Sequence, residues 1–118
     1  MPVIEAKNPE HFIELIKNDR CIVDFYATWC APCKRLATKL EDISKSLDDI
    51  TIVKVDINEL DTVAQAYSVN TIPYIVFYKK RKPYEAIQTS NHLDIIEKAR
   101  SLYESHDTPE SEECDTNK

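Results

Sequence analysis

The 118-residue chain contains no glycine, so every tight turn must be built from residues that carry a Cβ atom. Asn, Asp, Pro and Lys are the expected turn formers. No apolar run approaches the roughly 18 residues that a membrane helix needs, so we expect no membrane-spanning segment. The first residues, Met1-Pro2-Val3-Ile4-Glu5, lack the patterns of a secretory signal and of an arginine-rich transit peptide. A cytosolic protein is therefore expected.

A surplus of positive charge is also missing, which argues against a protein that binds nucleic acid. The net charge is −6, and residues 104–118 hold six acidic side chains and one basic one. The rest of the chain is therefore nearly neutral and has no excess of cations for binding phosphates. We expect one domain over 1–103 and an acidic, disordered tail over 104–118, because the tail has almost no apolar side chains to bury.

Apolar periodicity predicts alternating strands and helices along the rest of the chain. Short runs rich in β-branched and aromatic side chains predict strands at 3–6, 21–27, 50–55, 74–78 and 84–88. Helical spacing predicts a helix that starts at Asn8 and further helices over 36–47, 60–67 and 91–102. The basic run Lys79–Lys82 is interpreted as a solvated turn between strands, with a patch that steers partners as the alternative.

This order of elements predicts the fold class. Alternation in the first part favours parallel strands joined by crossover helices, and the last two strands are expected to form an antiparallel hairpin. The expected class is α/β: a central mixed sheet flanked by helices on both faces.

Four cysteines are present, and only Cys30 and Cys33 form a local pair. The pair follows a buried strand and opens a helix, where free N–H groups and the helix dipole stabilise a thiolate. Cys30 is nearer to those amides and to solvent, so we expect it to attack a substrate disulfide. Cys33, one turn further in, is expected to be more buried and to resolve the resulting mixed disulfide.

Zinc binding is the competing interpretation of Cys30 and Cys33. Structural zinc usually has four ligands, and the chain has neither a second Cys-x-x-Cys nor a spaced histidine pair. A redox pair is favoured, and no metal is expected. Cys21 opens a buried strand and is expected to be an inert core thiol. Cys114 lies in the acidic tail, where a free thiol and a regulatory or intermolecular disulfide both stay open.

Two further features accompany the cysteine pair. Asp24 interrupts the apolar run 22–25, where burial would raise its pKa and let it exchange a proton near neutral pH. It could then deprotonate Cys33 through a water; a solvent-facing position at a strand edge is the alternative. Pro73 starts an apolar strand, where it cannot complete a hydrogen-bonded ladder. It indicates a tight turn, and the sequence does not decide between cis and trans.

Three separated segments resemble the thioredoxin family: Val23–Lys34, which contains Trp29-Cys30-Ala31-Pro32-Cys33, then Lys54-Val55-Asp56, and Tyr67–Pro73. The resemblance spans residues 3–103, in order and with compatible spacing. It implies the thioredoxin fold with a mixed four- or five-stranded sheet. It also implies a protein-disulfide reductase that maintains redox homeostasis by reversible dithiol–disulfide exchange.

The resemblance implies roles for individual residues. Cys30 would be the nucleophile, Cys33 the resolving thiol, and the two would form the redox disulfide. Asp24 would be the buried proton acceptor, and Lys54 would pair with it or modulate it. Pro73 would follow a cis peptide bond and help to pair with an extended substrate chain. A flat apolar docking surface would comprise Trp29, Ala31, Pro32 and Ile72.

Partners also follow from the resemblance. No cofactor would be bound, and electrons would come from NADPH through a flavin-dependent thioredoxin reductase. The clients would be proteins that contain disulfides, and a monomer is the simplest expectation.

The chain departs from the family pattern at several positions. Ala31 replaces the usual glycine between the cysteines, Tyr74 stands where threonine is common, and the segment 88–91 lacks the family's glycine. These changes leave the shape of the substrate groove open. An oxidase or isomerase of the same fold commonly has histidine between the cysteines, so Ala31-Pro32 favours a reductase. A non-catalytic binding module with a diverged groove is the third possibility.

Overall fold

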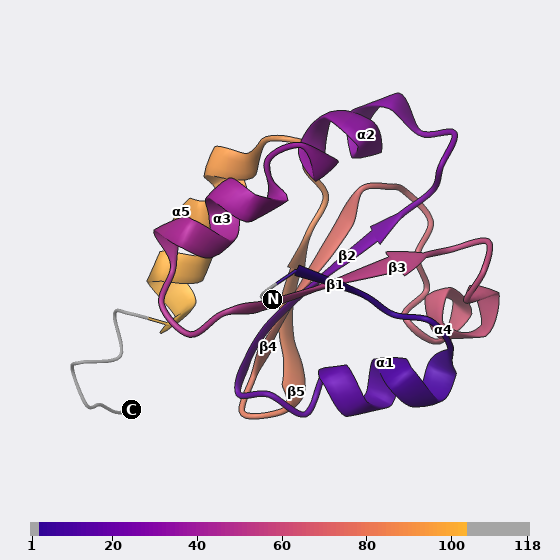
Figure 1. Cartoon of the computed structure of the whole chain (residues 1–118), viewed down its shortest axis with the longest axis horizontal. Coiled ribbons are helices and arrows are strands. Elements are labelled where there is room, and N and C mark those ends of the chain that lie inside the picture. Colours follow the sequence, from indigo (N-terminus) through magenta and orange to yellow (C-terminus); the bar gives the residue numbers. More distant parts are fainter. Residues whose placement is uncertain (1–2, 104–118) are drawn as a thin grey trace.

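Five strands form one mixed sheet at the centre of the structure, a computed structural model that describes residues 3–103 (Figure 1). In sheet order the strands are β1 (Val3–Glu5), β3 (Thr51–Asp56), β2 (Arg20–Tyr26), β4 (Tyr74–Lys79) and β5 (Lys82–Ile87). β3 is parallel to both β1 and β2, whereas β4 is antiparallel to β2 and β5. The predicted mixed sheet and its terminal hairpin are confirmed.

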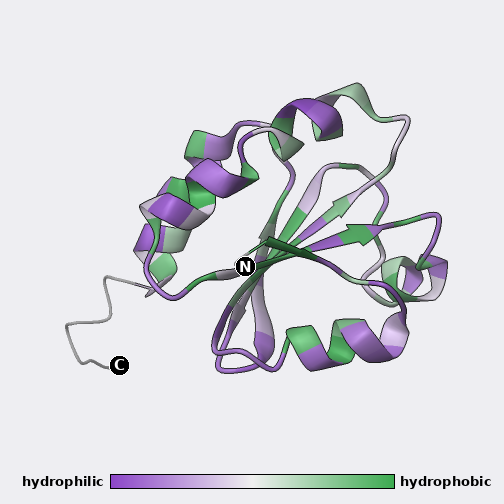
Figure 2. Cartoon of the chain, in the orientation of Figure 1, coloured by the Kyte–Doolittle hydropathy of each residue, from purple (hydrophilic) through white to green (hydrophobic). Residues whose placement is uncertain are grey.

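Helices cover both faces of the sheet, as predicted. One face carries α2 (Ala31–Ala37), α3 (Leu40–Ser46) and α5 (His92–Tyr103), and the other carries α1 (Pro9–Leu15) and α4 (Asp61–Ala66). Because side chains alternate along a strand, each face has its own core. Figure 2 shows apolar residues along the central strands, with polar and apolar residues alternating along the helices.

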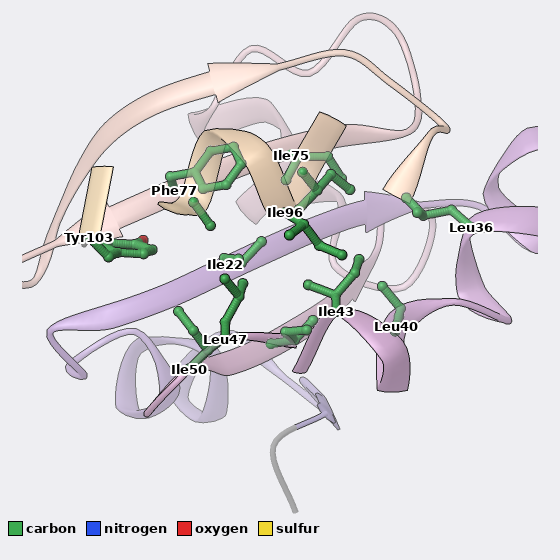
Figure 3. Close-up of a cluster of buried hydrophobic side chains, with 13 residues drawn as sticks. Ile22, Leu36, Leu40, Ile43, Leu47, Ile50, Ile75, Phe77, Ile96 and Tyr103 are labelled. Atoms are coloured by element: carbon green, nitrogen blue, oxygen red, sulfur yellow. The ribbon is translucent and has the colours of Figure 1, made fainter. Parts of the chain in front are cut away.

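The core under α2, α3 and α5 packs the C-terminal part of α2 against the sheet. Figure 3 shows Ile22 of β2 and Leu36 of α2 among its buried side chains. Residues of β2 that lie an even number of positions from Ile22 project from the same face of the sheet. Asp24 is therefore on the face that α2 covers.

The start of α1 follows the sequence prediction. Asn8 is the N-cap, its Oδ1 accepts a hydrogen bond from the N–H of His11 at 2.7 Å, and Pro9 occupies the first helical position. The cap satisfies an amide that has no partner within the helix, and proline there loses no helical hydrogen bond.

The single helix predicted over 36–47 is wrong, because α2 and α3 are separate helices. The helix is interrupted at Thr38, whose hydroxyl donates to the carbonyl of Arg35 at 2.8 Å. The next N–H, that of Lys39, donates to Leu36 O at 2.8 Å, a tighter spacing than the α-helical one. Leu36 and Leu40 still enter the same core, so apolar periodicity does not reveal the break.

The absence of glycine forces other residues into left-handed backbone. The two turn residues between β4 and β5, Lys80 and Arg81, have φ of 55° and 68°. Such positive angles suit a tight two-residue hairpin turn, although they cost about 1–2 kcal/mol per residue with a Cβ. Asp49 and Ser68 also have positive φ. The basic run is therefore a turn, as predicted, but Ser and Arg join the expected turn formers.

Tyr103 fastens the end of α5 to the sheet. Its buried hydroxyl donates to the carbonyl of Tyr78 in β4 and lies 3.4 Å from the carbonyl of Cys21 in β2. We expect Tyr103→Phe to lower the free energy of unfolding by about 1–2 kcal/mol in urea titrations, because a buried hydrogen bond is lost. The exposed Tyr84→Phe is the matched control, and an equal loss in both variants would contradict the assignment.

Within residues 3–103, no helix is both long and apolar enough to cross a membrane. The tail over 104–118 and its Cys114 lie outside the described residues.

Candidate active site

The cysteine pair lies where β2 leads into α2. Cys30 is the N-cap of α2, and a disulfide joins it to Cys33 with a Cα–Cα distance of 5.2 Å. The N–H of Cys33 donates to Cys30 Sγ at 3.2 Å. That amide, with the dipole of the helix, would stabilise a thiolate on Cys30 once the disulfide is reduced.

Both cysteines are shielded from solvent in this oxidised form. The exposed fractions are 5% for Cys30 and 2% for Cys33, so Cys30 is only marginally more accessible. The two sulfurs pack in a small cluster with Ala27, against which Tyr26 and Ile72 also lie. The surrounding side chains are therefore mostly apolar, which limits access of water to the disulfide.

Trp29 stands out from the surface next to the pair. Its side chain is 67% exposed, and its indole Nε1–H donates to Asn58 Oδ1 at 3.1 Å. Asn58 follows β3, where Asp56 Oδ1 accepts from the N–H groups of Asn58 and Glu59 at 2.9 and 3.4 Å. This turn holds the indole in place. Sequence reasoning missed Asn58, because nothing in its local pattern indicates a contact with a residue so far along the chain.

The loop before β4 supplies the other wall of the site. The Ile72–Pro73 peptide bond is cis, which the sequence alone left undecided and the resemblance implied. Ile72 is half-buried against the cysteine cluster, and Pro73 is buried. From α2, Ala31 is exposed and Pro32 half-buried. The structure thus brings Ile72 to the disulfide from a segment far from it in sequence.

Asp24 is buried in the sheet, so the alternative of a solvent-facing residue is wrong. The residue is 1% exposed, and neither of its carboxylate oxygens has a hydrogen-bond partner among the described residues. Burial raises its pKa from 3.8 to about 7, while Lys54 lowers it and Glu5 raises it. A carboxyl group with this pKa can accept and return a proton near neutral pH.

Lys54 lies beside Asp24 but is paired elsewhere. The parallel register places Lys54 opposite Asp24 on one side and Glu5 on the other. Its ion pair is with Glu5, at 3.8 Å, and its Nζ lies 4.7 Å from the centre of the Tyr26 ring. The resemblance implied that Lys54 would pair with Asp24 or modulate it, and the described residues contain an ion pair of Lys54 with Glu5 and none with Asp24. Sequence reasoning missed Glu5 and Tyr26, because this contact joins three strands.

Cys21 has the expected position of a core thiol. It is completely buried under α1 and α4, and burial raises its pKa to about 12. It therefore stays protonated at neutral pH and is a poor nucleophile. Within residues 3–103, no group of three or more His, Cys, Asp or Glu side chains is placed to hold a metal ion.

Two of the departures from the family pattern, Tyr74 and the segment 88–91, have contacts that explain their place in the structure. Tyr74 packs against the core residue Phe25, with 6.1 Å between ring centres. In the glycine-free segment, Thr89 Oγ1 donates to Asp94 Oδ2 at 2.8 Å, and Asn91 Oδ1 accepts from the N–H of Leu93 at 3.0 Å. That segment therefore serves as the hydrogen-bonded entry to α5.

Comparisons with known proteins agree with this geometry. The model of the thioredoxin family matches residues 3–101. Thioredoxin from Chlamydia trachomatis is 36% identical over 83 residues, which cover 70% of this chain and 81% of that protein. Thioredoxin-1 from Schizosaccharomyces pombe is 34% identical over 90 residues, covering 75% of this chain and 87% of its own length.

Solved structures give the same result. Oxidised mitochondrial thioredoxin 3 from Saccharomyces cerevisiae superposes with a TM-score of 0.78 and 31% identity, over 85% of this chain and 95% of that one. Plasmodium falciparum thioredoxin gives a TM-score of 0.77 and 28% identity, over 82% and 96% of the two chains. With the Cys30–Cys33 disulfide at the start of α2, these matches show that the chain belongs to the thioredoxin family and is a thiol–disulfide oxidoreductase.

Proposed function

We propose that the chain acts in the reducing direction, on disulfides in other proteins. The observation that carries the proposal is the redox pair at the N-terminus of α2, beside the exposed Trp29 and the half-buried Ile72. A folded protein cannot insert a disulfide into a deep pocket, and here Cys30, although only 5% exposed in the oxidised form, is bordered by the exposed Trp29 and Ala31. The Ala31-Pro32 pair, which lacks the histidine common in oxidases, supports the same direction.

The reaction proceeds in two exchanges. The Cys30 thiolate attacks one sulfur of the client disulfide, forms a mixed disulfide and releases the other client sulfur as a thiolate. Cys33 then loses its proton to Asp24 through a water and attacks Cys30 Sγ. The bond between Cys30 and the client breaks, and the departing client sulfur takes up a proton, as the client thiolate released in the first exchange also does from solvent. The client disulfide is reduced to two thiols, and the cysteine pair is oxidised to the Cys30–Cys33 disulfide.

Asp24 is proposed as the proton acceptor because a base with a pKa near the working pH is efficient. Its pKa of about 7 meets that condition. Lys54 modulates it through its positive charge.

The docking surface is proposed to lie around the disulfide. Its residues share an apolar or small side chain near the start of α2 or in the loop before β4: Trp29, Ala31, Pro32, Ile72 and Pro73. Shielding by these groups would exclude water from the exchanging sulfurs, and the backbone beside Pro73 would pair with an extended client segment.

The proposal extends to the cellular context. Electrons would come from NADPH through a thioredoxin reductase, and no cofactor would be bound to the chain itself. We place the protein in the cytosol as a monomer, with a redox domain over 1–103 and an acidic tail over 104–118.

The reduction potential of the Cys30–Cys33 pair tests the direction of the reaction. We expect equilibration with glutathione buffers to give a reduction potential of about −270 mV, the value typical of thioredoxin. A value of roughly −180 to −120 mV, the range of isomerases and oxidases, would contradict the proposal. Failure to catalyse reduction of insulin by dithiothreitol, with the disulfide intact, would favour a non-catalytic binding module.

A further inference from the structure

One row of side chains crosses three strands beside the redox site. In register, Glu5 of β1 is the partner of Lys54 in β3, which is also the partner of Asp24 in β2. Alternation places all three on one face of the sheet. The single lysine thus lies between two carboxyl groups, one on each neighbouring strand, and its side chain is long enough to approach either of them.

The ammonium group of Lys54 is held on the Glu5 side. Its Nζ lies 3.8 Å from Glu5 Oε1 and 4.7 Å from the centre of the Tyr26 ring. The Tyr26 hydroxyl donates to the other carboxylate oxygen, Glu5 Oε2, at 2.7 Å. By contrast, neither oxygen of Asp24 has a hydrogen-bond partner among residues 3–103. Glu5 is therefore clamped by two contacts, and Asp24 is left without any.

We propose that Glu5 is a positioning residue for the redox reaction, holding the Lys54 ammonium group on the β1 side of the sheet and away from Asp24. The inference rests on the proposed role of Asp24 as proton acceptor for Cys33. An ammonium group in direct contact with Asp24 would stabilise its ionised form and make it a weaker base. Glu5 prevents that contact and adds a negative charge of its own near Asp24, so both effects keep Asp24 basic.

The environment of Asp24 contains few other charges. Lys54 faces it from β3 and Glu5 from β1, and these are the two charged groups that shift its pKa, in opposite directions. On its own strand, burial and the bond to Glu5 raise the pKa of Tyr26, so its hydroxyl stays protonated and remains a donor. β4 places the apolar Ile75 opposite Asp24. The same face carries Asp56, two residues beyond Lys54 in β3, whose Oδ1 accepts from the N–H groups of Asn58 and Glu59. The Cys33 thiol of α2, once reduced, is the titratable group that the proposed reaction brings to Asp24.

Replacement of Glu5 tests the proposal through the titration of Asp24. In Glu5→Gln, the Asp24 carboxyl carbon is followed by 13C NMR as a function of pH in oxidised protein. We expect its midpoint to fall by about one pH unit, since Lys54 is released and a neighbouring negative charge is removed. The pH profile of mixed-disulfide resolution should shift to lower pH by a similar amount.

Two further variants separate positioning from a simple charge effect. In a Lys54→Met background, Glu5→Gln should shift the Asp24 midpoint by less than half as much, because the lysine on which Glu5 acts is gone. Tyr26→Phe keeps the ring but removes the donor to Glu5, and it should shift the midpoint partway in the same direction. Glu14→Gln is the matched control: it breaks an exposed ion pair, with Lys17 at 3.7 Å, and should leave the midpoint unchanged.

The proposal is overturned if Glu5→Gln leaves the Asp24 midpoint in place, or if it shifts equally with and without Lys54. Neither result bears on the proposed function, because that function is tested independently, by measuring insulin reduction with the unaltered protein. Conversely, an unaltered protein that reduces no client would remove the proposed function, while the NMR titration would still report on the position of Lys54.

Discussion

A Cys33→Ser variant is expected to accumulate a stable mixed disulfide between Cys30 and client proteins, and its turnover should fall by at least about a thousandfold. Cys33 attacks from within the same turn of helix, where the local concentration of its thiol far exceeds that of any thiol in solution. Serine fits the same space but does not attack the mixed disulfide. The first exchange therefore still occurs, and the second does not.

Non-reducing gels and mass spectrometry of the trapped species measure this outcome. The experiment is best made in a Cys114→Ser background. In the Cys33→Ser variant of that background, the buried Cys21 is the only thiol besides Cys30. Cys30→Ser in that background is the matched control and should trap nothing. Adducts formed through Cys33 in the control, or none in Cys33→Ser, would remove the assigned order of attack.

Asp24→Asn is expected to make the protein more stable at pH 8, by up to roughly 4 kcal/mol, while leaving its stability near pH 4 almost unchanged. The pKa of Asp24 is raised from 3.8 to about 7. Between these two pH values, Asp24 keeps its proton in the native state but has lost it in the unfolded state. Stability therefore falls as the pH rises from about 4 to 7 and is flat above that. Asparagine does not titrate and avoids the cost of burying a charge.

Urea titrations of oxidised protein at several pH values measure the effect. The exposed Asp48→Asn is the matched control and should change stability by no more than about 0.5 kcal/mol at any of these pH values. A parent protein whose stability does not fall between pH 4 and 7 would contradict the raised pKa.

The same substitution should slow the second exchange. Loss of a positioned base is typically worth about a hundredfold in rate. Stopped-flow measurement of mixed-disulfide resolution near pH 7 should therefore show a slower step in Asp24→Asn, even though the variant is more stable. Greater stability with lower activity would identify Asp24 as a residue retained for its chemistry. An unchanged pH profile would leave Asp24 with a structural role only.

Much of the fold follows from local pattern. Apolar runs predicted the five strands, most clearly the central β2, β3 and β4, because a strand buried on both faces is almost continuously apolar. The alternation of strands with helices predicted the mixed sheet. The Asn8 cap and the turn at Lys80 and Arg81 were also readable, since each depends on neighbouring residues only. The break at Thr38 was not, because a side-chain hydrogen bond to Arg35 decides it while the apolar spacing continues unbroken.

For the site, the sequence determined the chemistry: the reactive pair Cys30 and Cys33 at a helix start, and Asp24 within an apolar strand. Only the tertiary structure decided the pairing of Lys54 with Glu5 and the contact of Trp29 with Asn58. The reason is physical. Helix dipoles and strand burial act over a few neighbouring residues, whereas these contacts join segments that only the register of the sheet and the packing of its loops bring together.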